Sequence, residues 1–167
     1  MFAIKAEMLP VIREHAFLYG VILMLSNSHY RKLENMMHSA PIVKLVGARV
    51  KISHAYAEIT LPANKELFHA AGALHGAMYF LALDNAAFFA VNSLVEDVFV
   101  LTVSFNIYLL RPISSGIIKA EGKVVNSTKT QYLAESILYD ADNKEIARGS
   151  GVFVRGKIKL MPEIGYK

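Results

Sequence analysis

The strongest clue to the fold is a segment over residues 73–94 that is apolar on nearly every helical face. It reads ALHGAMYFLALDNAAFFAVNSL. A helix without a polar face must be buried, either in a protein core or in a membrane. Asp84 and Asn85 stand in its middle, where a bilayer would impose a cost of several kcal/mol. The segment is therefore predicted to be a helix that other parts of the chain enclose.

The segments able to enclose this helix resemble strands and are separated by turn residues. β-branched and aromatic residues alternate roughly within residues 46–61, 98–111, 116–127, 130–140 and 144–156. They predict about six strands, the last four running as an antiparallel meander. The predicted fold class is α+β, with one curled antiparallel sheet wrapped around one long central helix.

The beginning of the chain has a different pattern. Helices are predicted over 8–25 and 28–39, so we expect an N-terminal helical extension over 1–40 and a main domain over 41–167. The extension contains the apolar run AFLYGVILML (16–25), which is too short to span a membrane. We therefore expect no stable membrane insertion.

Composition removes several classes of function. The chain has no cysteine, which excludes disulfides, thiolate metal sites and cysteine nucleophiles and suits a cytoplasmic protein. The histidines show no ligand spacing, so no metal is expected. The net charge of +4 comes from scattered residues, and nothing resembles a nucleic-acid reader. An apolar fraction of 54% points to buried subunit interfaces.

Asp84 is the first candidate for chemistry. Residues at i±3 and i±4 on its own helical face are apolar,. A carboxylate in such surroundings is normally paired, neutralised or functional. One interpretation is an Asp bonded to neighbouring backbone or turned to solvent at a gap in an interface. The other is a general base whose pKa the apolar cleft raises.

The second candidate is the sequence GALHG (72–76) at the start of the same helix. The backbone N–H of Gly76 can polarise a carbonyl and hold the oxyanion formed on attack. Alternatively, Gly72 and Gly76 only permit a tight turn. Asp84 lies about 12 Å further along the helix, too far for one water attacking one carbonyl to contact both residues. Two such helices packed antiparallel would form a composite site between subunits, and a monomer would be inactive.

These residues resemble a known family. HGAMYFLALDNAAFFA (75–90), followed by LTVSFNIYLLRPISSGIIKAEGKVV (101–125), is similar to the hotdog-fold thioesterases, in particular the phenylacetate-degradation and acyl-CoA thioesterase branch. The resemblance covers about residues 45–155. It implies the hotdog fold, in which a curled sheet encloses the central helix.

The resemblance also implies roles for four catalytic candidates. Asp84 corresponds to the general base or nucleophile, Gly76 to the N–H donor for the thioester oxygen, and Thr102 to the hydroxyl that orients water. His69 stands where the family carries Asn or Gln. It can still donate a hydrogen bond or act as an acid or base, or it can mark altered or lost activity.

Substrate-binding residues complete the predicted site. They are His75, Tyr79, Phe80, Phe88, Arg111 and Lys123. The three aromatic side chains are expected to contact an aromatic or medium-chain acyl group. Arg111 and Lys123 are either near the phosphates of coenzyme A or ordinary solvated charges. His75 fits a cap of the turn better than a catalytic role, and the methionines, Met36 and Met37 among them, fit core or acyl-pocket lining.

The resemblance thus implies hydrolysis of an acyl-CoA thioester to free acid and coenzyme A, with coenzyme A as part of the substrate and no further cofactor. We expect a homodimer, and a homotetramer built as a dimer of dimers. A non-catalytic acyl-CoA or fatty-acid binding protein is the alternative. A hotdog dehydratase ranks lower, because its His and acid motif is not found.

Overall fold

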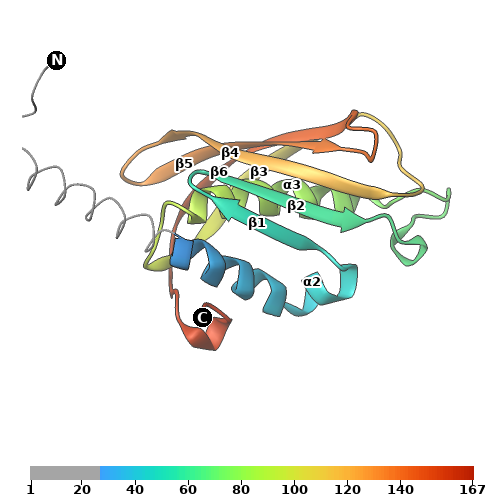
Figure 1. Cartoon of the computed structure of the whole chain (residues 1–167). Coiled ribbons are helices and arrows are strands. Elements are labelled where there is room, and N and C mark those ends of the chain that lie inside the picture. Colours follow the sequence, from blue (N-terminus) through green and yellow to red (C-terminus); the bar gives the residue numbers. More distant parts are fainter. Residues whose placement is uncertain (1–26) are drawn as a thin grey trace, which may run out of the picture.

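The computed structural model describes residues 27–167, so the predicted helix over 8–25 and its apolar run lie outside the described residues. Residues 27–39 are helical, in agreement with the prediction for 28–39. The elements that follow are α2 (Pro41–Val46), β1 (Arg49–Ser53), β2 (Tyr56–Pro62), η1 (Lys65–Leu67), α3 (Gly76–Asn92), β3 (Val98–Leu109), β4 (Ile117–Ser127), β5 (Gln131–Tyr139), β6 (Glu145–Lys159) and η2 (Pro162–Ile164) (Figure 1).

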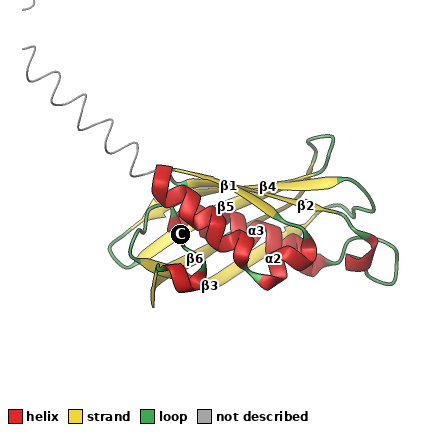
Figure 2. Ribbon diagram, turned by 60° about the horizontal axis from the view of Figure 1, so that its bottom comes forward, coloured by secondary structure: helices red, strands yellow, loops and turns green. Residues whose placement is uncertain are grey.

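The strands form one antiparallel six-stranded sheet in the order β1-β2-β4-β5-β6-β3. The sheet curls over α3, and the helical segment 27–46 lies along the side of the curl that the strands leave open (Figures 1 and 2). The predicted α+β architecture of a curled sheet around a central helix is therefore confirmed.

One part of the predicted topology is wrong. The last four strands do not form a meander, because β3 pairs with β6 at one edge of the sheet while β2 pairs with β4. The outer edge of β4 is already occupied by β2, so β3 has to join the other side. The connection over 110–116 crosses between the two positions.

The segment predicted to be strand-like over 46–61 is a hairpin of β1 and β2. Its turn contains Ala55 with a positive φ of 55°. The Ala55 N–H donates to Ser93 Oγ at 2.8 Å, and the Ala55 carbonyl accepts from the Val124 N–H at 3.0 Å. Two distant elements therefore hold this turn, which contains no glycine, proline or asparagine.

Close packing explains why α3 is apolar on all sides. A Cβ atom added to Gly122 of β4 would lie 2.2 Å from the carbonyl carbon of Ala86, so only glycine allows the helix to approach the sheet this closely. The helix ends at Asn92, whose buried side chain donates to the Val95 carbonyl at 2.9 Å and accepts from the Val100 N–H at 3.2 Å. These bonds direct the chain from the helix into β3.

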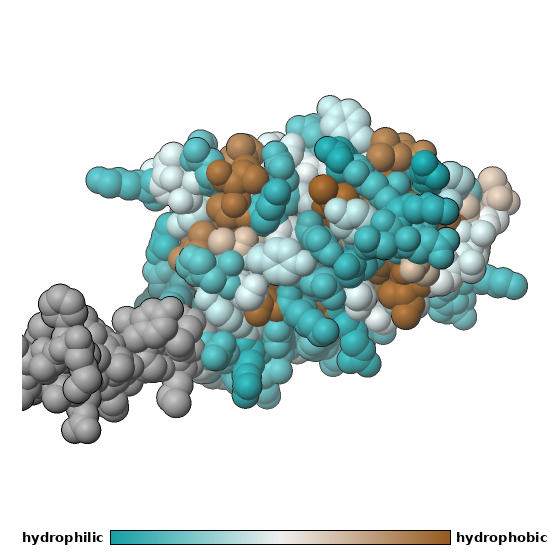
Figure 3. All heavy atoms as spheres, turned by 45° about the horizontal axis from the view of Figure 1, so that its top comes forward, coloured by the Kyte–Doolittle hydropathy of each residue, from teal (hydrophilic) through white to brown (hydrophobic). Residues whose placement is uncertain are grey.

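The two edges of the sheet differ in how they are covered. The β1 edge is covered by helix 27–39: the Ile52 N–H donates to Glu34 Oε1 at 2.8 Å and the Val50 N–H to His38 Nε2 at 3.3 Å. The β3 edge has no neighbouring strand within residues 27–167. Large apolar side chains along it are exposed, namely Leu101, Val103, Tyr108 and Leu109. Elsewhere, on the outer face of the sheet, apolar groups are scattered among hydrophilic ones (Figure 3).

Candidate active site

Asp84 lies halfway along α3, half-buried, with its carboxylate directed at β3. Thr102 donates its hydroxyl to Asp84 Oδ1 at 3.0 Å. Burial raises the pKa of Asp84, and the hydrogen bond from Thr102 opposes this by favouring the charged form,. A carboxylate with a raised pKa and a fixed hydroxyl beside it is suited to general-base or nucleophilic chemistry.

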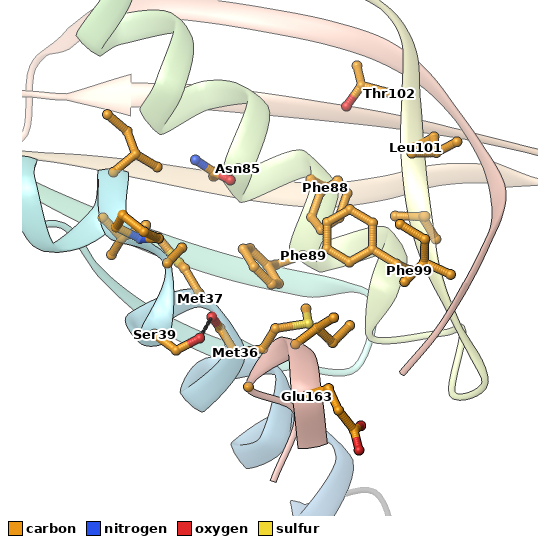
Figure 4. Close-up of a pocket in the computed structure, with 18 of the residues that line it drawn as sticks. Met36, Met37, Ser39, Asn85, Phe88, Phe89, Phe99, Leu101, Thr102 and Glu163 are labelled. Atoms are coloured by element: carbon orange, nitrogen blue, oxygen red, sulfur yellow. Dashed lines mark hydrogen bonds between the residues drawn. The ribbon is translucent and has the colours of Figure 1, made fainter. Parts of the chain in front are cut away.

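A large cavity of about 870 Å³ opens next to this pair. It lies between α3 on one side and the segment 36–43 on the other, and the start of β3 and the C-terminal turn η2 also contribute to its lining (Figure 4). Its lining includes Met36, Met37, Ile42, Val43, Asp84, Asn85, Phe88, Phe89, Phe99, Val100, Leu101, Thr102, Ile158, Glu163 and Ile164. Most of these side chains are apolar, which suits a hydrocarbon group attached to a polar reacting centre.

A second, smaller cavity of about 310 Å³ lies at the other end of α3. His69, Gly76 and Arg111 line it together with Leu74, Tyr79, Leu109, Leu110 and Pro112. Gly76 is the first residue of α3, and its N–H makes no hydrogen bond within residues 27–167. The amide is therefore available to an oxygen atom of a ligand.

The two histidines near Gly76 are tied to their own loops. His75 is the N-cap of α3, and its Nδ1 accepts from the Ala77 N–H at 3.1 Å,. His69 Nδ1 accepts from the Ala71 N–H at 3.1 Å. Both rings are exposed and their centroids are 6.5 Å apart. In each ring only Nε2 is left to face a ligand.

The predicted aromatic residues lie in different places. Phe88 lines the large cavity. Tyr79 is buried beside the small cavity, and its hydroxyl donates to the Arg111 carbonyl at 3.0 Å. Phe80 lines neither cavity and packs edge-on against Phe105, with ring centroids 5.8 Å apart.

The predicted basic residues also separate. Arg111 lies at the small cavity. Lys123 is exposed on β4, in register with Tyr56, and lines neither cavity.

Several lining residues were not predicted from the sequence. Phe89, Phe99, Leu101, Glu163 and Ile164 belong to the large cavity. Helical spacing from Asp84 could have found Phe89, one turn beyond and beside Phe88. The others come from β3 and from the C-terminal turn, and only the folded chain brings these segments together.

A single chain does not bring all four catalytic candidates together. Asp84 and Thr102 line the large cavity, whereas His69 and Gly76 line the small one. Eight residues of helix separate Asp84 from Gly76, which corresponds to about 12 Å.

Within residues 27–167, no three His, Cys, Asp or Glu side chains lie close enough together to hold a metal ion. In the same part of the chain, every helix is too short or too polar to cross a membrane.

The chain is similar to known thioesterases and esterases. The family model of the thioesterase superfamily matches residues 71–147. A candidate esterase of Sulfurisphaera tokodaii is 27% identical over 132 residues, which are 78% of this chain and 96% of that protein. The predicted resemblance to the thioesterase superfamily is therefore confirmed.

Solved structures agree with this comparison. The Escherichia coli PaaI protein from the phenylacetic acid degradation operon matches with a TM-score of 0.74 at 19% identity, covering 82% of this chain and 99% of that chain. A thioesterase family protein from Silicibacter pomeroyi matches with a TM-score of 0.69 at 26% identity, covering 77% and 99%. The predicted hotdog fold is therefore confirmed.

Proposed function

We propose that this chain, which resembles the hotdog-fold thioesterase superfamily, belongs to it and hydrolyses acyl-CoA thioesters at a site shared by two subunits. The observation that carries the proposal is the Asp84–Thr102 pair. A carboxylate with a raised pKa accepts a hydrogen bond from a hydroxyl at the mouth of a large apolar cavity. This arrangement joins a basic group to a site for a hydrocarbon substituent.

In the proposed reaction Asp84 removes a proton from a water molecule that Thr102 orients. The oxygen of that water bonds to the thioester carbonyl carbon and the carbonyl oxygen gains negative charge. The C–S bond then breaks, the free acid forms, and the coenzyme A thiolate leaves and takes up the proton. Direct attack by the Asp84 carboxylate is the other route to the same products, through an acyl-enzyme anhydride that water hydrolyses.

The oxyanion formed in this step needs a hydrogen-bond donor. The unused Gly76 N–H at the start of α3 fits this need, because a fixed N–H stabilises charge that develops during the reaction. We assign the role to the partner's Gly76, since the two groups of one chain are about 12 Å apart.

The free edge of β3 supports this shared site. Thr102 and Leu109 lie near opposite ends of β3, the first at the large cavity and the second at the small one. If two β3 strands paired antiparallel about an axis between Phe105 and Asn106, each Thr102 would stand opposite the partner's Leu109. The large cavity of one subunit would then meet the small cavity of the other.

The coenzyme A portion is assigned to the small-cavity side. Arg111 lines that cavity next to Gly76, and a guanidinium is suited to phosphate oxygens. We expect the reaction to take place in the cytoplasm, since a chain without cysteine suits a reducing compartment,. No cofactor beyond the coenzyme A of the substrate is proposed.

Release of free thiol from a panel of acyl-CoAs tests the proposal. Native protein should turn over at least one substrate, and Asp84→Asn should lower kcat/KM by about 100-fold or more. Asp142→Asn, the same change at an exposed turn between β5 and β6, serves as the control and should keep native activity. Absence of thiol release by native protein, or an active Asp84→Asn variant, would contradict the proposal.

A second candidate function is binding of acyl-CoA without turnover. It is favoured by His69, which occupies the position where the family carries Asn or Gln. The Nδ1 of His69 already accepts a hydrogen bond from the Ala71 N–H of its own loop. Calorimetric binding of an acyl-CoA to native protein that releases no thiol would support this candidate over hydrolysis.

A further inference from the structure

We propose that the large cavity binds an unbranched acyl chain, and that two segments outside the matched region 71–147 set its length. These segments are residues 36–43, at the end of the first described helix and in α2, and residues 158–167 at the C-terminus. The inference rests on the proposed function, since it assigns the substrate's acyl group to the cavity beside Asp84.

The proposed path of the acyl chain starts at Asp84 and Thr102. Asp84, Asn85, Phe88 and Phe89 line the cavity in succession, at the i, i+1, i+4 and i+5 positions of one helical face. The Asn85 side chain donates one of its two amide hydrogens to the Leu81 carbonyl at 2.9 Å,, and it is the last polar residue that α3 contributes to the cavity. Beyond Asn85 the helix presents only aromatic surface, and a hydrocarbon chain can follow it away from the carboxylate.

The opposite wall is flexible in shape and apolar. Met36 and Met37 face Phe88 and Phe89 across the cavity, with Phe99 of β3 beside them (Figure 4). Methionine side chains adapt to the outline of a ligand because they have several rotatable bonds and a polarizable sulfur. Such a wall accommodates a flexible chain of methylene groups better than it specifies one rigid ring.

The C-terminal turn forms the wall of the cavity farthest from Thr102 (Figure 4). Glu163 and Ile164 of η2 line the cavity, and the turn is fastened to the rest of the molecule. Tyr166 contacts His29, with the hydroxyl oxygen 2.7 Å from His29 Nδ1, and His29 Nε2 lies 2.9 Å from the Asn92 carbonyl oxygen. The end wall is therefore a fixed part of the fold that can limit chain length.

The placement of the other aromatic residues argues against an aryl substrate. Tyr79 and Phe80 do not line this cavity, so they cannot stack on a ring held beside Asp84. A cavity of about 870 Å³ is also much larger than a short aryl group fills. Each methylene group of a longer linear acyl chain that becomes buried in the cavity should raise the binding affinity by about fourfold.

The test compares butyryl-, octanoyl-, dodecanoyl- and phenylacetyl-CoA as substrates of the native protein. We expect kcat/KM to rise with chain length and to be higher for octanoyl- than for phenylacetyl-CoA. Met37→Phe and Ile164→Trp should each lower the ratio of dodecanoyl to butyryl kcat/KM by about tenfold. Ile164 is only half-buried, so its variant leaves the core intact even where Met37→Phe fails to fold.

The matched control is Leu45→Phe. Leu45 belongs to α2 but is 75% exposed and lies outside the cavity, so the chain-length ratio should stay at the native value. A native preference for phenylacetyl-CoA, or a ratio that none of the cavity variants changes, would overturn the inference.

Binding separates this inference from the proposed hydrolysis. Calorimetry with the Asp84→Asn variant should give tighter binding of dodecanoyl-CoA than of phenylacetyl-CoA, and Ile164→Trp in that background should remove the difference. If native protein turns over nothing but this binding pattern appears, hydrolysis fails and the acyl-chain site stands. If turnover is found without any chain preference in binding, the acyl-chain site fails alone.

Discussion

At the scale of single residues, the protonation state of Asp84 decides whether the proposed reaction can proceed. Burial raises the pKa of this carboxylate, and the hydrogen bond from Thr102 lowers it. The ionised form is the one that can accept a proton or attack a carbonyl. Activity should therefore fall as the pH drops through the pKa of Asp84, at a higher pH than for an ordinary aspartate.

Thr102→Val should move this acidic limb further upward. Without the hydroxyl, no hydrogen bond from Thr102 counteracts the effect of burial on Asp84. The pKa of Asp84 therefore rises further, and a higher pH is needed to ionise it. The measurement is the pH profile of kcat/KM for native protein, Thr102→Val and Thr102→Ser, with the serine variant expected near native. Ser104→Ala, an exposed position on the same strand, should leave the profile unchanged. A limb that stays in place in Thr102→Val would argue against a bond between these two groups in solution.

Sequence patterns identified residues in an unusual environment, but they did not predict the direction in which a side chain points. Asp84 could be found because it is charged within an apolar helix. Thr102 needed the family resemblance, because nothing local distinguishes it from other exposed strand residues. The register of β4 turns Lys123 to the outside of the sheet, and the position of Phe80 on α3 turns it to Phe105. Such directions depend on tertiary contacts.

At the scale of elements, the C-terminal turn is attached to the first described helix through one buried histidine. Burial lowers the pKa of His29, whereas in the unfolded chain this group titrates at its ordinary value. Between the two values the unfolded chain binds more protons, so stability decreases as the pH falls through that window. Above the ordinary histidine pKa of about 6.5, this contribution to stability is constant.

His29→Gln should remove part of this pH dependence. Native protein is expected to lose thermal stability as the pH falls below the ordinary histidine pKa of about 6.5. The variant should lose less, although it starts from a lower Tm because the bonds to Tyr166 and Asn92 are altered. Thermal unfolding followed by circular dichroism measures both effects. His54→Gln in the exposed β1–β2 turn is the control and should behave as native. Equal pH slopes for native and His29→Gln would show that another group is responsible.

Elements with a local signal were predicted correctly, and connections without one were not. The central helix and the strands after it follow from apolar periodicity and turn residues. The β1–β2 turn was missed because Ala55 is held by Ser93 and Val124 and not by its own sequence. The partner of β3 was predicted wrongly because strand order depends on which sheet edge is already occupied.

At the scale of the whole molecule, the proposed site can be tested by mixing two inactive variants. Gly76→Pro removes the proposed oxyanion donor but suits the first position of a helix, and His75 before it is already extended, with φ −63° and ψ 139°,. Gly76→Pro and Asp84→Asn should each be inactive alone. After joint refolding, half of the dimers are mixed and carry one intact site of two, so activity should recover to about a quarter of native.

The recovery is measured as thiol release after the two variants are refolded together or separately. Size-exclusion chromatography with light scattering, applied to every sample, controls for equal assembly. Recovery only in the joint sample supports a site built from two chains. Inactivity of the joint sample, with dimers present, would mean that both groups act within one subunit.

The cover that Glu34 and His38 place over β1 also determines how far edge-to-edge growth can proceed. A sheet open on both sides can add strands without end, as filaments do. Within residues 27–167 this sheet offers a single open edge, so each copy can pair strands with one other copy. Two copies that join through β3 would leave no open edge among the described strands, so strand pairing would stop at two copies. The first described helix thus blocks the addition of a strand at the β1 edge of the sheet.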